Sequence, residues 1–171
     1  MTSFDANEAD GLFEQPAEKS LEGYRMSSIT VWFIRSAMIY FLLAIVLGIF
    51  MSVAGPLYPW MPIHVHFNLL GWMSMMIYGV GYHILPRFSG KPLWNDRLAY
   101  GQLWLANIGL VGMAIGWWVR NASNNSTVLL LFSLVETVSI VFFVLNMMLT
   151  IKAAPAPAPA PPKPPAPPVK K

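Results

Sequence analysis

Three histidines are the side chains best suited to ligate a metal or a heme iron, since the chain contains no cysteine. His64, His66 and His83 all lie in one apolar run, residues 63–85. A helix over this run separates His66 from His83 by about 25 Å, so one copy cannot hold a single ion with both. The same geometry turns His64 and His66 about 200° apart, toward different sides of the helix.

The two sides of this helix differ in character. The side of His64 is small and polar, like a packed helix interface, and carries Asn68, Gly71, Met75 and Tyr82. The side of His66 is apolar, which suits lipid or the plane of a heme, and carries Leu70, Met73, Ile77 and Ile84. Periodicity by itself therefore favours His64 as the inward histidine. Copper binding by the pair His64 and His66 is an alternative of low specificity.

Glu136 is an ionisable side chain placed deep in another apolar run. It lies about 14 Å along residues 127–151 from the Thr127 end. Because a charge at that depth is costly, Glu136 should face the protein interior and be either protonated or paired. Asn107 lies at a matching depth in residues 98–119, so we expect a hydrogen bond between the two. A proton relay through Glu136 is the alternative.

The elements that position these residues are predicted to be membrane-spanning helices. The chain is 56% hydrophobic and 11% charged, whereas soluble domains carry about 25% charged residues. Four apolar runs reach the length of about 20 residues that a hydrocarbon core requires: 29–54, 63–85, 98–119 and 127–151. Since backbone groups in lipid must be paired within the segment, each run should be a helix. The predicted fold is an all-α, polytopic bundle of four transmembrane helices.

Basic residues set the predicted orientation of this bundle. With four spans, both termini and the loop before residue 98 lie on the same side of the membrane. Of the lysines and arginines outside the spans, all but Arg120 are on that side. We therefore predict a bacterial inner-membrane protein with both termini in the cytoplasm.

Residues 1–28 are predicted to be a disordered acidic arm, 29–152 the membrane domain, and 153–171 a disordered Ala/Pro/Lys tail. No basic patch suggests nucleic acid.

A sequence motif in the second apolar run resembles a known family. Residues 66–72 read His-Phe-Asn-Leu-Leu-Gly-Trp, and Tyr78-Gly79 and Tyr82-His83-Ile84-Leu85-Pro86 follow. The pattern resembles the second helix of heme-copper oxidase subunit I, above all in nitric oxide reductases and cbb-type oxidases. In that family a histidine near the outer end of this helix ligates the low-spin heme b. The resemblance, which covers residues 29–119 at most, implies this role for His66, with His64 as second choice.

The chain also departs from this family. Its catalytic subunits have further helices, which supply the second low-spin heme ligand, the high-spin heme ligand and the copper histidines. No histidine follows His83 in this chain. We therefore do not expect the chain alone to form a binuclear centre or to be a complete oxidase or reductase.

A b-type heme at His66 would need a sixth ligand, and His/Met is an allowed axial pair. Met51, at the end of residues 29–54, and Met113, about 22 Å along residues 98–119, lie near the level of His66. His64, or a histidine of a second copy, is a further candidate. His83, at the opposite end, either pairs with a headgroup or carbonyl or anchors a second heme in an oligomer.

The resemblance implies a small b-type heme protein that carries electrons within a respiratory or denitrification complex. Its expected partners are the lipid bilayer, a second copy or larger oxidase or reductase subunits, and a c-type cytochrome. Two other functions stay open. One is a cofactor-free accessory or assembly subunit that docks through its proline-rich tail. The other is copper or heme handling through His64, His66 and the methionines.

Overall fold

The computed structural model describes residues 26–55 and 57–151. All regular structure in this part of the chain is helical, which confirms the all-α prediction. The predicted tail at 153–171 lies outside the described residues, and so does almost all of the predicted arm at 1–28.

The described chain forms helices α2 (Ser28–Ala54), α3 (Trp60–His66), η1 (Phe67–Ser74), α4 (Met75–Phe88), α5 (Asp96–Ser123) and α6 (Thr127–Thr150). Three of them, α2, α5 and α6, are long and apolar enough to cross a membrane. The fourth predicted span lies within α3, η1 and α4, which follow one another without a break. That this stretch also crosses the membrane, and which membrane face each end occupies, stay predictions.

The outer surface of the bundle is strongly apolar. Leu42, Val46 and Ile49 of α2 are each 63% exposed, and large apolar side chains are also exposed on the other helices. A soluble monomer rarely exposes a continuous apolar surface of this extent. The surface therefore fits the hydrocarbon of a bilayer.

Short polar residues define where two of the helices begin and where one ends. The Ser27 hydroxyl accepts a hydrogen bond from the Thr30 backbone N–H at 3.4 Å, so Ser27 caps the start of α2. Asn95 caps α5 in the same way, because its side-chain oxygen accepts from the Leu98 N–H at 3.0 Å. Asn124 closes α5 in the left-handed conformation, with φ of 55°, which asparagine tolerates.

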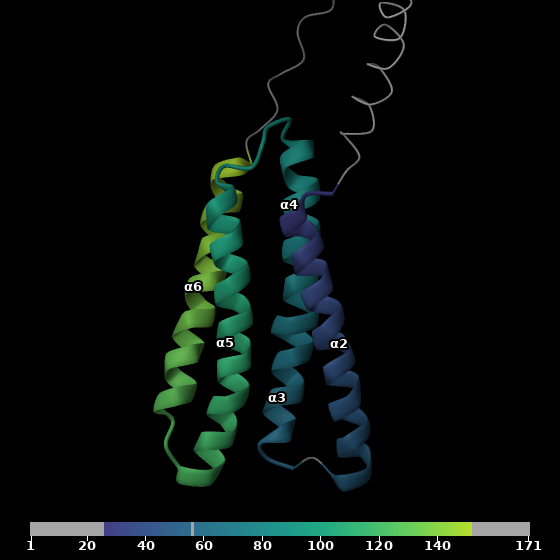
Figure 1. Ribbon diagram of the computed structural model, residues 1–171, viewed down its shortest axis with the longest axis vertical. Helices are drawn as coiled ribbons and strands as arrows, with labels where there is room; N and C mark the ends of the chain where they lie inside the picture. Colours follow the sequence, from purple (N-terminus) through teal and green to yellow (C-terminus); the bar gives the residue numbers. More distant parts are fainter. Residues whose placement is uncertain (1–25, 56, 152–171) are drawn as a thin grey trace, which may run out of the picture.

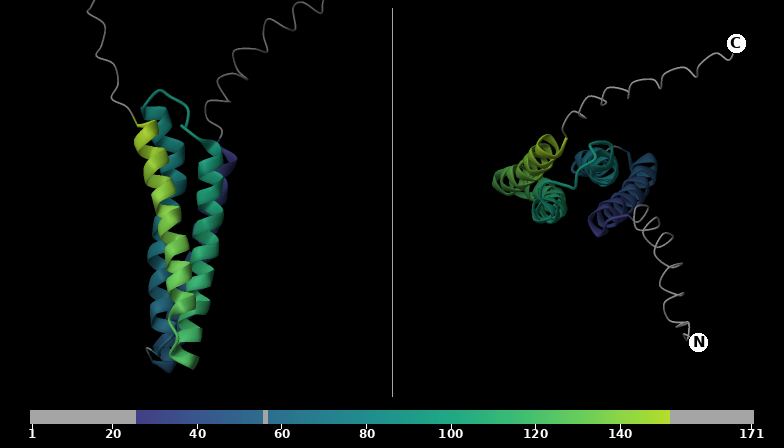
Figure 2. Two further views of the ribbon diagram at one scale, coloured as in Figure 1. Left: turned by 90° about the vertical axis from the view of Figure 1, so that its left-hand side faces the viewer. Right: turned by 90° about the horizontal axis from the view of Figure 1, so that it is seen from above.

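The helices are arranged as two antiparallel pairs (Figure 1). Seen along the bundle, α2 lies beside the α3–η1–α4 stretch, and α5 lies beside α6 (Figure 2). The start of α2, the α4–α5 connection and the end of α6 lie at one end of the bundle, which we call the Trp94 end. The α2–α3 and α5–α6 connections lie at the opposite end, which we call the Trp60 end.

Glycines of α5 allow its close contact with α6. A Cβ added to Gly116 would lie 2.6 Å from the Cα of Leu129, and one added to Gly109 would lie 2.9 Å from the backbone nitrogen of Glu136. At Gly112 the same atom would lie 2.1 Å from the ring of Phe132. Small residues are the usual means of close helix approach in membranes, and these three glycines serve that purpose between α5 and α6.

An aromatic cluster joins the two pairs toward the Trp94 end. Phe33 of α2 contacts Tyr78 and Tyr82 of α4, with ring centroids 5.8 and 5.6 Å apart. Phe143 of α6 contacts the same two tyrosines at 4.5 and 5.5 Å. Phe33 is fully buried and both tyrosines are less than 8% exposed. Packing of these rings therefore holds α2, α4 and α6 together.

The π-helix η1 interrupts the α-helical period between the histidines and the rest of α4. The hydroxyl of Ser74 donates to the Leu69 carbonyl, five residues back, at 2.8 Å. Because a π turn holds more residues than an α turn, a stripe drawn with a period of 3.6 does not continue through it. Met73 and Ile77, predicted to share a side with His66, are 51% and 55% exposed, whereas His66 lies against α5.

We expect Gly116→Ala to destabilise the protein by about 1–3 kcal/mol, because the added methyl group would overlap backbone atoms of α6. Gly101→Ala is the matched control, since its Cβ would meet only the Phe142 ring at 3.5 Å, an ordinary contact. Thermal unfolding of both variants in detergent measures the effect. Equal unfolding temperatures for the two variants would contradict the close α5–α6 contact.

Candidate functional site

His66 is the last residue of α3, directly before the π-helix. Its Nδ1 lies 2.7 Å from the carbonyl oxygen of Pro62. Because a carbonyl only accepts, Nδ1 carries the proton, and Nε2 keeps its lone pair. Nε2 makes no hydrogen bond with any described residue. The ring lies 6.0 Å from that of Trp117, so His66 faces α5.

His64 is fixed against α2 instead. Its Nδ1 donates to the carbonyl oxygen of Ala44 at 2.9 Å, and its Nε2 lies 3.3 Å from the amide nitrogen of Asn68. Close approach of the ring is possible because residue 48 is glycine, where a Cβ would lie 3.1 Å from the ring of His64. Both ring nitrogens of His64 are therefore engaged in helix packing.

The two histidines thus contact different helices, as their separation around the helix predicted. Gly71, Met75 and Tyr82, which were predicted to share the side of His64, are all buried. Across the described residues no three histidine, aspartate or glutamate side chains approach closely enough to hold a metal ion. One ion held by His64 and His66 of the same copy does not fit this arrangement.

His83 lies far from the other two histidines, near the Trp94 end of α4. The guanidinium of Arg87 is hydrogen-bonded to His83 Nε2 and also donates to the His83 carbonyl oxygen at 3.3 Å. A cationic donor at Nε2 occupies the lone pair that a metal would need. His83 thus pairs with a side chain one turn away, and its pairing with a headgroup stays a prediction.

The two candidate methionines differ in burial. Met113 of α5 is 6% exposed and lies four residues before Trp117, on the same side of the helix. Met51 lies in the last turn of α2 and is partly buried. Met113 is therefore on the side of α5 that faces His66. For an axial pair, the described chain offers one free imidazole nitrogen at His66 and a thioether at Met113.

Glu136 is buried in α6, with 3% of its surface exposed, and its Oε2 accepts no hydrogen bond from the described residues. The expected bond to Asn107 is not formed. The Asn107 amide instead donates to the Leu103 carbonyl at 2.8 Å, and its Oδ1 accepts from the Tyr40 hydroxyl at 3.1 Å. No sequence pattern pointed to Tyr40 as the partner of Asn107, because the depth of Tyr40 on another helix becomes relevant only when α2 packs on α5.

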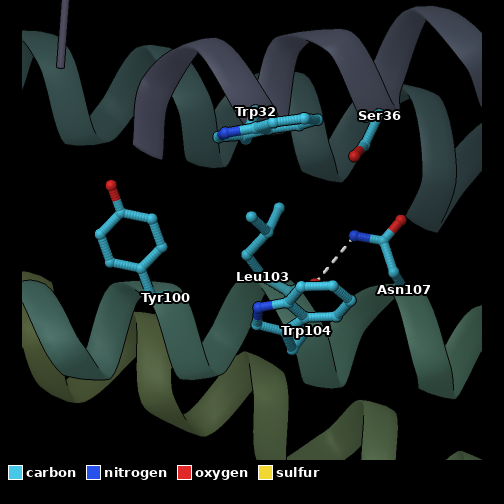
Figure 3. Close-up of a pocket in the computed structure, with 6 residues that line it drawn as sticks. All are labelled: Trp32, Ser36, Tyr100, Leu103, Trp104 and Asn107. Carbon is cyan, nitrogen blue, oxygen red and sulfur yellow. Dashed lines mark hydrogen bonds between the residues drawn. The ribbon is translucent and has the colours of Figure 1, made fainter. Parts of the chain in front are cut away.

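A groove between α2 and α5 was not predicted from the sequence. It has a volume of about 470 Å³, and Figure 3 shows Trp32 and Ser36 of α2 opposite Tyr100 and Trp104 of α5. Its walls are largely apolar, and the two indoles are 52% and 67% exposed. Tyr100 and Trp104, four residues apart on a helix, were the only sequence signal.

Replacing the two histidines separately should distinguish their roles in folding. We expect His64→Ala to lower the stability of the heme-free protein by about 1–2 kcal/mol, because it removes the hydrogen bond between α3 and α2. His66→Ala should change stability less, since the hydrogen bond of its ring lies within its own helix. Thermal unfolding in detergent measures both, and the reverse order would contradict this assignment.

Comparisons with known proteins found partial matches. The chain is 40% identical over 57 residues to cytochrome c oxidase subunit 1 of Rhodobacter capsulatus, which covers 33% of this chain and 11% of that protein. It is 31% identical over 87 residues to a cytochrome c oxidase subunit 1 homolog of Agrobacterium tumefaciens, covering 46% and 16%. It is 36% identical over 58 residues to the cbb3-type cytochrome c oxidase subunit CcoN1 of Stutzerimonas stutzeri, covering 33% and 12%.

The chain therefore spans only a small part of the length of these relatives. No family model matches it. No solved structure matches it either. The matches confirm the resemblance to heme-copper oxidase subunit I that the histidine motif indicated. The chain is thus an oxidase-related membrane protein that resembles cytochrome c oxidase subunit 1 over part of its length.

Proposed function

We propose that this chain binds a b-type heme through His66 and carries electrons within a respiratory or denitrification complex of a bacterial inner membrane. The observation that carries the proposal is the state of the His66 ring. Its Nδ1 donates to the Pro62 carbonyl, and its Nε2 is free of partners in the described chain. Metal-bound histidines typically have their second nitrogen fixed in this way, which sets the tautomer and the ring orientation.

The remaining residues near His66 fit a cofactor site close to the membrane surface. Trp117 covers one side of the ring, and Tyr58 packs on Trp117 with ring centroids 5.9 Å apart. A bound heme would supply one-electron redox chemistry, and these aromatic side chains would limit access of water. A position near the Trp60 end would let a c-type cytochrome approach the site from the aqueous phase.

Met113 is our choice for the second axial ligand. It is buried and lies on the side of α5 that faces His66, whereas Met51 lies in the last turn of α2 and is only partly buried. His64 is less suitable, because both of its ring nitrogens are already engaged. A histidine from a second copy remains the alternative donor.

A cofactor-free accessory subunit is the second candidate function. The close packing of His66 against Trp117 favours it, since a ring held by protein contacts needs no ligand. Relatives named as oxidase subunits support a larger oxidase as its partner. Copper handling has less support, because His64 and His66 contact different helices.

The test of heme binding is a dithionite-reduced minus oxidised spectrum of the purified full-length protein, expressed with ample heme supply. We expect the bands of a b-type heme in wild type and in His64→Ala, and their loss in His66→Ala. His64→Ala is the matched control, since it removes an imidazole two residues away. A colourless wild-type protein would refute heme binding and leave the accessory subunit.

The second axial ligand has a test of its own. If Met113 ligates the iron, Met113→Leu should convert the low-spin spectrum to a high-spin one, because leucine keeps the volume but has no donor atom. Met51→Leu is the control and should leave the spectrum unchanged. An unaltered spectrum in Met113→Leu would contradict the assignment of Met113. The second axial ligand would then come from a second copy or from another subunit.

A further inference from the structure

Buried polar side chains are concentrated in one half of the bundle. They are Thr30, Gln102, Glu136, Ser139, Asn146 and Thr150, each with no more than 3% of its surface exposed. All of them lie between the middle of α6 and the Trp94 end. In the described part of the other half the buried side chains are apolar: Ala44, Ile63, Leu110, Met113 and Leu129.

The polar series starts at the Trp94 end, where α5 begins and α6 ends. The Thr150 hydroxyl accepts from the Trp94 backbone N–H at 3.0 Å and donates to the Asn146 carbonyl at 2.6 Å. The Asn146 side chain bonds the N–H and the carbonyl of Asn95 at 3.1 and 2.9 Å. The α4–α5 connection is thereby tied to polar groups that continue into the bundle.

The series continues through side chains of α4, α5 and α6. Asn146 lies near the Tyr82 side chain, and the Tyr82 hydroxyl donates to Oε1 of Gln102. The Ser139 hydroxyl donates to the backbone carbonyl of Gln102 at 3.2 Å. The Nε2 of Gln102 is buried and has no acceptor among the described residues. A buried donor without a partner is unusual and marks a position where a further polar group is favoured.

Glu136 ends the series, one helical turn from Ser139 on α6. Its Oε2 has no donor in the described chain, and its nearest α5 residue is Gly109, where a Cβ would lie 2.7 Å from that oxygen. The titratable groups described within its electrostatic reach are Tyr40 of α2 and Tyr78 of α4, and neither is a cation. A buried carboxylate without a cation or donor is strongly disfavoured, so this carboxyl group binds a proton.

We propose that Glu136 is a buried proton-binding site that exchanges protons with the aqueous phase at the Trp94 end only. The carboxylate accepts a proton from hydronium, which becomes water, and release reverses this step. The hydroxyl and amide groups of Tyr82, Gln102 and Ser139 lower the cost of moving a hydrated proton through the interior. Glu136 and these groups lie in the half of the bundle opposite His66, so proton binding there does not require heme.

The direction of exchange follows from the packing beyond Glu136. Toward the Trp60 end, the ring of Phe132 packs directly against Gly112, and the backbone of Leu129 packs directly against Gly116. Leu110, at 1% exposed, lies in the same apolar half. The buried polar residues of the described chain therefore all lie from Glu136 toward the Trp94 end, whereas polar residues toward the Trp60 end, such as Ser133 and Asn68, are only partly buried.

Infrared spectroscopy of the full-length protein in lipid nanodiscs, without added heme, tests this proposal. Carboxyl groups in water titrate at about pH 4, so they give no protonated C=O band at neutral pH. We expect one such band in wild type, its loss in Glu136→Gln, and its shift on transfer to D₂O. The rate of that shift should fall about tenfold in Tyr82→Phe, as expected for the loss of one hydrogen-bonding group from the relay.

Ser139→Ala is a second variant of the polar series and should also slow the shift. Leu129→Met is the control in the apolar half and should exchange at the wild-type rate. Circular dichroism establishes that each variant is folded. Absence of the band in wild type, or equal exchange rates in Tyr82→Phe, Ser139→Ala and Leu129→Met, would overturn the proposal.

Discussion

A polar group inside a hydrocarbon layer has to find its partner within the protein, and this constraint governs the whole bundle. The backbone satisfies it by forming helices throughout the described chain. Side chains satisfy it by pairing across helices, as Tyr40 does with Asn107, His64 with Ala44 and Tyr82 with Gln102. The few polar atoms left without partners, at Gln102 and Glu136 among them, are therefore the positions where chemistry is most readily accommodated.

Close helix contact is what brings these partners together. Glycines on α5 let α6 approach to backbone distance, which places Glu136 directly against Gly109. Gly48 has the same effect on α2, where its missing side chain leaves room for the ring of His64. Small residues thus do more than fill the interface, because they decide which polar side chains can reach one another.

The two ends of the bundle carry different chemistry. His66 and Trp117 lie toward the Trp60 end, where the fully buried side chains are apolar. Glu136 and the polar series lie in the half toward the Trp94 end. The π-helix η1 separates the two regions on the second helical stretch, and it turns the residues that follow it relative to the histidines. One chain thereby combines a free imidazole and a buried carboxyl group at different depths.

The all-α fold and the resemblance to oxidase subunit I follow from the sequence alone, because they depend on local composition and on motifs. The sequence also determined that His64 and His66 point to different sides. Which helix each histidine faces depends on packing between helices, and the side assigned to His66 did not hold because the π-helix that follows breaks the α-helical period. Pairing of Asn107 with Tyr40 rather than Glu136 depends on how α2 packs against α5, a long-range contact that depth along a single helix cannot reveal.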